Sequence, residues 1–228
     1  MKMYEKKKSG MRISACILAM ILLFAALPAQ ASAASIDVPD SLILTLYASK
    51  DLNAAGDSKS VSALTLISSG KVTGLKSNDT SIVKIYKNTV DDGTEILLLP
   101  KKTGTTKVSF KVGNKKYTTK ITVKKYVNPI SSVTVGDTKI SSSKFKTLSY
   151  ANLKYADYKG KKVKVTFQLK SGWSLTSGYI NVFYANSKTT SVKNGKKITI
   201  SGGKGCALLV LVQKDSTGQT ELINLNFK

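Results

Sequence analysis

The chain has 228 residues, of which 42% are hydrophobic, and this is enough for one large domain or for two of roughly 100 residues each with packed cores. Its 36 lysine and arginine residues outnumber its 13 acidic residues, so the formal net charge is +23. The chain contains no histidine, which excludes histidine metal ligands and the serine–histidine and cysteine–histidine pairs of hydrolases.

Residues 1–33 have the pattern of a secretory signal peptide. Several lysines and Arg12 precede an apolar run over residues 13–27, and small residues follow, with A-x-A cleavage sites that end at Ala31 and at Ala33. The apolar run is shorter than the ~20 residues that span a bilayer. We therefore expect cleavage rather than an uncleaved membrane anchor, and no membrane span in the mature chain.

The mature chain keeps one cysteine, Cys206, because Cys16 leaves with the signal peptide; Cys16 also precedes the apolar run, so we do not expect a lipid anchor there. Without a disulfide, a secreted fold depends on its core. Arg12 is the only arginine, so the mature chain has 31 lysines against 12 acidic residues, a balance of +19. Lysine is a hydrated point charge, whereas arginine recognises guanine and phosphate with paired donors. The charge therefore favours diffuse attraction to polyanions over sequence-specific nucleic-acid recognition.

Apolar residues recur with a period of two along most of the mature chain, which is typical of β-strands with one buried face. Residues 107–112 and 117–124 alternate in this way around Gly113-Asn114, so they predict a hairpin with its lysines on the solvent side. Downstream, residues 162–170 and 223–228 alternate likewise. Many short strands of this kind, separated by glycine and asparagine, predict antiparallel β-sandwiches.

Two further signals refine the second half of the chain. Asn194-Gly195 is a strong signal for a type I′ hairpin turn. Residues 206–212 (CALLVLV) are apolar on both faces, which predicts a central strand. Pro129 interrupts the strand ladder just after Tyr126, and this is the best internal boundary. The predicted organisation is a signal peptide over 1–33 and two modules, 34–126 and 127–228, each near the size of an immunoglobulin-like sandwich.

Three segments of the first module carry a family resemblance: Ser77–Ile85, Leu97–Phe110 and Lys120–Tyr126. They contain a serine–asparagine–aspartate motif before a short strand, a glycine–threonine turn and a closing strand with T-V. The module resembles the bacterial Ig-like group 2 domain over residues 60–126. The second module resembles the Ig-like units that follow such domains in secreted proteins of Gram-positive bacteria, through its strand pattern and a Gly-Trp pair. The resemblance implies an all-β fold of two tandem immunoglobulin-like antiparallel β-sandwich domains, used as a spacer or adhesion module and not as an enzyme.

Aromatic residues of the second module have two interpretations. In the first, an exposed platform stacks on a sugar ring or contacts a protein; the candidate ligand-binding residues are Trp173, Tyr179, Tyr184, Tyr155 and Tyr158. In the second, these aromatics belong to the core. Ig sandwiches bury one tryptophan against a cysteine pair, and here Trp173 would pack near Cys206, with Val165 or Phe167 in place of the second cysteine.

Lysine, serine and the twelve carboxylates of the mature chain are the remaining candidates for catalysis, and the only adjacent acidic pair is Asp91-Asp92, before Gly93. A calcium or catalytic site is one interpretation, and an ordinary turn is the other. We expect no metal, no cofactor and no enzyme activity.

These observations predict a secreted, non-catalytic cell-surface adhesion or interaction module, located outside the cell or on the cell wall. The expected partners are bacterial cell-wall anionic polymers, surface glycans or another protein. Electrostatic attachment is expected because the sequence shows neither a sortase-type motif nor an apolar C-terminal anchor. The alternative function is a carbohydrate-binding module that uses the second-domain aromatics. Nucleic-acid binding has the charge in its favour, but no recognised motif.

Overall fold

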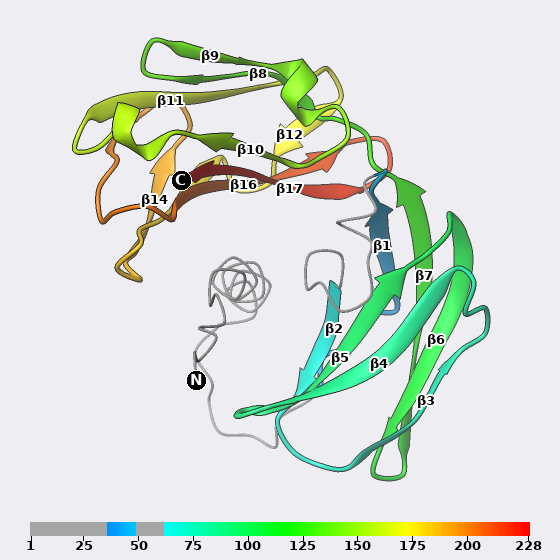
Figure 1. The fold of residues 1–228 in the computed structure, drawn as a ribbon. Coiled ribbons are helices and arrows are strands. Elements are labelled where there is room, and N and C mark those ends of the chain that lie inside the picture. Colours follow the sequence, from blue (N-terminus) through cyan, green and yellow to red (C-terminus); the bar gives the residue numbers. More distant parts are fainter. Residues whose placement is uncertain (1–35, 49–61) are drawn as a thin grey trace, which may run out of the picture. The chain divides into compact units, whose positions relative to one another are not determined.

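The computed structural model describes residues 36–48 and 62–228 (Figure 1). The signal-peptide prediction, which covers residues 1–33, lies outside the described residues. The described residues form two compact units: the first contains residues 36–44 and 62–123, and the second contains residues 45–48 and 124–228. The end of the first described strand therefore groups with the second unit. The predicted all-β fold is confirmed, because strands of both units form multiple sheets with mostly antiparallel pairs.

The described part of the first unit has seven strands: β1 (Ser41–Leu46), β2 (Ser62–Ile67), β3 (Val72–Ser77), β4 (Val83–Val90), β5 (Gly93–Pro100), β6 (Gly104–Val112) and β7 (Lys115–Lys125). They form one sheet in the order β1-β7-β6-β3 and a second in the order β2-β5-β4. The third, sixth and seventh strands thus share one sheet, and the second, fourth and fifth share the other. This is the strand order of an immunoglobulin-like sandwich, with the first strand paired to the last.

The predicted hairpin over residues 107–124 is present as β6 and β7. Gly113 and Asn114 form its two-residue turn, and the positive φ of Gly113, 57°, explains why glycine occupies that position. The inward residues of the hairpin enter the core, where Phe110 and Ile121 are almost fully buried. Phe110 also stacks on Tyr117 across the hairpin, with 5.4 Å between the ring centroids.

Asp91 and Asp92 form the turn between β4 and β5, whose last ladder pair is Val90 with Gly93. Gly93 has a positive φ of 141°, and a Cβ at this position would collide with the carbonyl oxygen of Ile67. The glycine after the two aspartates is therefore needed for the close approach of β2 and β5. The ordinary-turn interpretation of this acidic pair matches the structure.

The second unit contains ten strands and two short 3-10 helices: β8 (Ile130–Val135), β9 (Thr138–Ser141), η1 (Ser142–Phe145), β10 (Tyr150–Leu153), η2 (Tyr155–Asp157), β11 (Lys162–Leu169), β12 (Trp173–Leu175), β13 (Tyr179–Phe183), β14 (Thr189–Lys193), β15 (Lys197–Thr199), β16 (Cys206–Lys214) and β17 (Thr220–Phe227). One sheet has the order β10-β17-β16-β13-β14, with β12 also paired to β16, and the other has the order β15-β11-β8-β9. Tyr150 lies in β10 and Tyr155 in η2, and β10 pairs with β17 in parallel.

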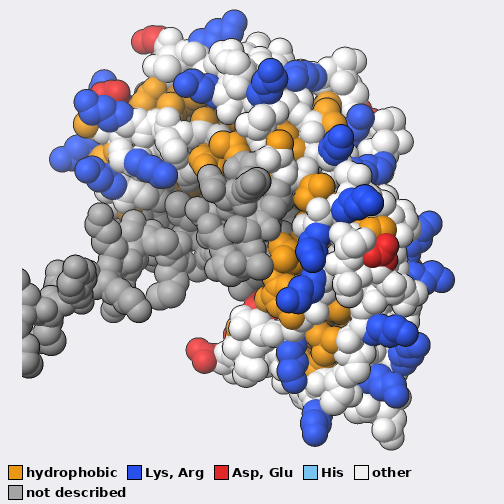
Figure 2. All heavy atoms as spheres, turned by 45° about the vertical axis from the view of Figure 1, so that its right-hand side comes forward, with side chains coloured by type: hydrophobic (Ala, Val, Ile, Leu, Met, Phe, Trp, Pro, Cys, Tyr) orange, Lys and Arg blue, Asp and Glu red, His pale blue; other side chains and the backbone are white. Residues whose placement is uncertain are grey.

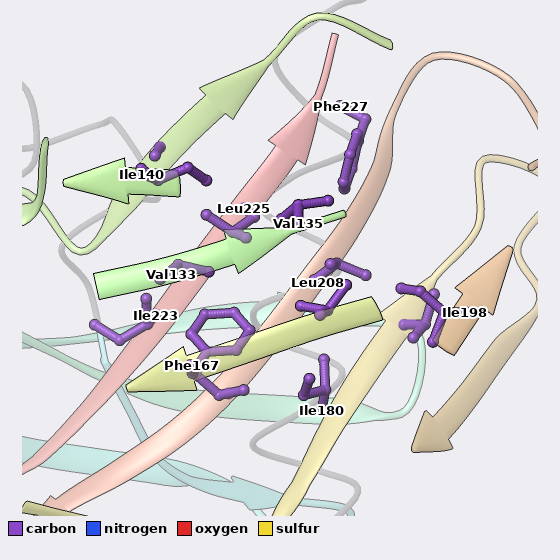
Figure 3. Packing of buried hydrophobic residues seen from close by; sticks show 14 of the residues in the cluster. Val133, Val135, Ile140, Phe167, Ile180, Ile198, Leu208, Ile223, Leu225 and Phe227 are labelled. Atoms are coloured by element: carbon purple, nitrogen blue, oxygen red, sulfur yellow. The ribbon is translucent and has the colours of Figure 1, made fainter. Parts of the chain in front are cut away.

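The core of the second unit lies between its two sheets. Phe167 and Val133 come from one sheet, and Leu208, Ile223 and Leu225 come from the other, and all five are almost fully buried (Figure 3). The prediction of a central strand at residues 206–212 is confirmed, because β16 has partners on both sides. Burial on both faces is the reason that this strand is apolar throughout.

The predicted hairpin at Asn194-Gly195 is wrong. The strand before this turn, β14, pairs with β13, whereas the strand after it, β15, pairs with β11 in the other sheet. Asn194 instead acts as a surrogate strand residue: its Oδ1 accepts from Phe167 N–H at 2.9 Å, and its Nδ2 donates to the Phe167 carbonyl at 2.9 Å. The side chain satisfies both backbone groups of Phe167, and the chain crosses from one sheet to the other at this turn.

Candidate functional site

The outer surface of the β6–β7 hairpin is composed of lysine, serine and threonine alone. On β6 the outward residues between 105 and 111 alternate with buried ones, and on β7 the same holds between 116 and 122. The register pairs these outward residues with one another, so that Lys107 lies opposite Lys120 and Lys111 lies opposite Lys116. We name this surface the lysine face; it consists of Lys107, Lys111, Lys116, Lys120, Thr105, Ser109, Thr118 and Thr122.

The two lysine pairs occupy the closer of the two pair types in an antiparallel ladder. The two-residue turn makes Val112 and Lys115 a hydrogen-bonded pair, and the two pair types alternate along the ladder from there. Both lysine pairs therefore fall on non-hydrogen-bonded positions. Two backbone bonds agree with this assignment: Lys120 N–H donates to the carbonyl of Asp40, and the Lys107 carbonyl accepts from Asn78 N–H, both at 2.9 Å and both away from the hairpin. Opposing Cα atoms in such pairs are about 4.5 Å apart.

A fifth lysine extends the lysine face onto the neighbouring strand. Lys76 of β3 is exposed and lies in register with Ser109, midway between Lys107 and Lys111 along β6. Like charges directly opposite each other destabilise a sheet. With ammonium groups splayed to roughly 8 Å in water, each pair costs about 0.5 kcal/mol before screening by salt. The fold tolerates this small repulsion because these side chains are exposed to water, as are the many lysines scattered over the surface in Figure 2.

The second unit contains a buried polar cluster around Glu221, which is only 1% exposed. Three side chains donate hydrogen bonds to its carboxylate: Thr45 at 2.7 Å, Tyr47 at 3.0 Å and Gln219 at 2.9 Å. Gln219 also donates to the carbonyl of Lys125 at 3.1 Å. The cluster thus ties the segment that begins at Thr45 to β17 within the second unit.

Burial raises the pKa of Glu221 to about 7, although the hydrogen bonds from Thr45, Gln219 and Tyr47 favour its charged form. Burial and the nearby Glu221 carboxylate raise the pKa of Tyr47 well above its ordinary value, so this phenol remains a donor. The ring of Tyr47 packs on that of Tyr126 at a centroid distance of 5.1 Å, and Tyr126 donates to the carbonyl of Phe145 at 3.0 Å. The rings of Tyr47 and Tyr126 thus pack together beside the polar cluster.

The five aromatic candidates do not share an exposed face. Trp173, Tyr155 and Tyr158 belong to the hydrophobic core of the second unit, with exposed fractions of 9%, 8% and 7%. Tyr155 also accepts from Gly203 N–H at 3.1 Å, and Tyr158 meets Phe227 edge-on. Tyr184 packs partly against the same core. Tyr179 is exposed, at 40%.

The expected contact between Trp173 and Cys206 is wrong. Trp173 of β12 lies opposite Lys214 at one end of β16, whereas Cys206 is at the other end, opposite Phe227. Eight residues of strand separate the two positions, or about 27 Å. Cys206 is fully buried, and burial raises the pKa of its thiol to about 11, so it packs as a small apolar residue.

Sequence reasoning missed Glu221, although a signal was present. Glu221 has the same parity as Ile223, Leu225 and Phe227, so the alternation that predicts β17 already places an acidic side chain in its core-facing row. Among residues 36–48 and 62–228, no group of three or more histidine, cysteine, aspartate or glutamate side chains gathers in a way that could hold a metal ion. Nor does this part of the chain contain a helix long and apolar enough to cross a bilayer.

Comparisons with known proteins returned solved structures only. No protein family matches the chain, and no curated protein does. Domains 5–6 of the S-layer protein SbsC are 14% identical over 86% of this chain and 98% of that chain, with a TM-score of 0.31. The D00-D0 domain of intimin is 14% identical over 84% and 96%, with a TM-score of 0.27.

Cadherin domains 1–5 of protocadherin gamma B2 are 11% identical, with a TM-score of 0.30, over 83% of this chain and 38% of that chain. The chain therefore spans well under half of this longer structure. Similarities at this level add nothing to the fold assignment, which rests on the order and register of the strands.

Proposed function

We propose that this chain is a secreted, non-catalytic interaction module of the cell surface that adheres electrostatically to anionic cell-wall polymers. The observation that carries the proposal is the register of β6 and β7, which gathers lysines, serines and threonines on one exposed surface. A mature charge of +19 supplies long-range attraction to a polyanion, and lysines on the strand surface supply short-range partners. Removal of a signal peptide would deliver the module to the cell exterior.

The environment of the buried carboxylate supports a non-catalytic role. Glycoside hydrolysis requires two carboxylates that face each other across a substrate cleft. Glu221, whose raised pKa would suit an acid catalyst, is 1% exposed and is enclosed by its donors Thr45, Tyr47 and Gln219. A substrate cannot reach this group without unfolding part of the second unit.

The carbohydrate-binding alternative receives no comparable support. A platform for sugar stacking needs aromatic faces that are exposed side by side. Of the five candidate residues, three are in the core and one packs partly against it. Surface glycans with anionic groups, or an acidic protein, are the other partners compatible with the lysines.

Sedimentation of the mature chain with purified Gram-positive cell walls tests the proposed function. We expect binding at about 50 mM salt and progressive release toward about 500 mM, because screening weakens charge pairs over this range. Walls from which the anionic polymers have been extracted should bind much less. Retention that does not change with salt, or that survives the extraction, would refute the proposal.

A further inference from the structure

We propose that the lysine face, together with Lys76, is a single defined site for a linear phosphodiester polymer laid along the strands. The inference rests on the function proposed above and assigns it to one surface of the first unit. It makes a sharper claim than general attraction by net charge, because it requires a small set of lysines to account for most of the bound charge.

The spacing of the lysines forms a ladder. Lys107 and Lys120 form one step, and Lys111 and Lys116 form another, four residues further along, or about 14 Å. Lys76 lies level with Ser109, halfway between them, so that an extended chain meets an ammonium group about every 7 Å. Flexible four-carbon stems let each lysine follow a polymer whose charges are not in strict register.

The hydroxyl groups of the lysine face complement this ladder. Outward threonine and serine residues lie between the lysine steps, and Thr105 and Thr122 approach each other to 3.4 Å between their Oγ1 atoms. Each hydroxyl can donate to a non-bridging phosphate oxygen, and each ammonium group has three donors for the same oxygens. A repeating phosphodiester thus finds both charge and hydrogen bonds on a flat surface.

The same residues disfavour nucleic acid as the occupant. Proteins that bind single-stranded nucleic acid place aromatic side chains under the bases, and this stacking supplies much of the affinity. Every outward position of β6 between 105 and 111, and of β7 between 116 and 122, is lysine, serine or threonine. The aromatic residues of the hairpin, Phe110 and Tyr117, alternate with these positions and stack on each other instead.

A salt titration of two charge-matched variants tests the site. The face variant combines Lys107→Gln, Lys111→Gln, Lys116→Gln and Lys120→Gln. The control variant combines Lys144→Gln, Lys146→Gln, Lys159→Gln and Lys204→Gln, which remove the same charge from exposed positions outside the strands of the second unit. The probe is purified poly(glycerol phosphate), and its affinity is measured by fluorescence anisotropy between 50 and 200 mM salt.

The expected difference is large. If five lysines hold a flexible phosphodiester, log K falls against log salt with a slope of about −3.5, a loss of about 100-fold over this range. The face variant should retain a slope of about −0.7 and lose about threefold, and its affinity at 50 mM salt should fall at least tenfold. The control variant should keep a slope close to that of the unmodified chain.

The other possible results would overturn the defined site, the proposed function or both. Equal losses in both variants would overturn the defined site and leave the proposed function standing, since diffuse charge would then suffice. No binding by the unmodified chain would refute both. Single-stranded DNA bound tenfold more tightly than poly(glycerol phosphate) at 150 mM salt would assign the surface to nucleic acid instead.

Folding of the variants is checked by circular dichroism. Removal of like-charge pairs should leave the melting temperature of the face variant unchanged or higher. If the four substitutions together prevent folding, the double variant Lys107→Gln, Lys120→Gln replaces them, with an expected change in slope of about 1.4. An unchanged slope in this double variant would also overturn the site.

Discussion

The buried carboxylate of Glu221 should make the second unit lose stability as the pH rises. Its pKa is about 7 in the folded chain, against 4.5 as the ordinary value for the unfolded chain. Between these two values the folded state binds more protons than the unfolded state, so the free energy of unfolding falls with increasing pH. The stabilisation is fully present below about pH 4.5, decreases across pH 4.5–7 and is lost above about pH 7.

The pKa difference sets the size of this effect. At about 1.4 kcal/mol for each pH unit, the full change amounts to about 3.5 kcal/mol. Glu221→Gln keeps the shape of the side chain and removes the charge, so the variant should lose this pH dependence. At pH 8 we expect it to be more stable than the unmodified chain by about 2 kcal/mol, because the exchange of an oxygen for an NH2 group beside three donors offsets part of the gain. At pH 4.5 the variant should be equally stable or less stable than the unmodified chain.

Urea unfolding at several pH values measures the change. Trp173 is the only tryptophan and is buried in the second unit, so its fluorescence reports on the unit that contains Glu221. Glu95→Gln is the matched control, because Glu95 is also buried, at 4%, but belongs to the first unit. This variant should leave the pH dependence of the Trp173 signal unchanged. The reasoning would be wrong if the free energy of unfolding of the second unit stayed constant or rose from pH 5 to pH 8, and if that of Glu221→Gln changed with pH in the same way.

Three further outcomes are expected. Trp173→Ala should lower the free energy of unfolding by about 3–5 kcal/mol, as measured by circular dichroism, because a buried aromatic is lost from the core; a change below 1 kcal/mol would place the ring outside it. Cys206 should react with a thiol reagent only in the unfolded chain, because burial hides the thiol and raises its pKa to about 11; rapid labelling of the native protein would contradict this. Asn194→Ala should lower the free energy of unfolding in urea by about 2 kcal/mol, since both backbone groups of Phe167 lose their partner. Asn194→Asp should cost less, because its carboxylate can still accept from Phe167 N–H. Equal stability of the unmodified chain and both variants would exclude this role of Asn194.

Local pattern was a reliable guide wherever neighbouring residues alone decide the structure. The β6–β7 hairpin follows from alternation around Gly113-Asn114, because the turn fixes the register of all later pairs. The central position of β16 follows from its apolar residues on both faces. In contrast, the turn signal at Asn194-Gly195 is local, but its outcome depends on which sheet offers a free strand edge. Here β11 binds both the asparagine side chain and β15, so the chain changes sheets.

Site residues were harder to predict, because aromatic side chains serve cores and surfaces equally well. Nothing in the sequence around Trp173 states whether its ring faces solvent, since burial depends on strands that are distant along the chain. Glu221 is the opposite case. Its place in the core-facing row was visible in the alternation, but the donors Thr45 and Tyr47, which make its burial tolerable, are separated from it by more than 170 residues.

The sequence by itself determined the all-β class, lysine as the only basic residue after Arg12 and the outward direction of the hairpin lysines, since these depend on composition and on a period of two. Tertiary structure alone decided the rest. It placed Lys76 beside the hairpin, enclosed Glu221 and separated Trp173 from Cys206 along β16. Pairing between distant strands is set by the packing of whole sheets, which no short stretch of sequence specifies.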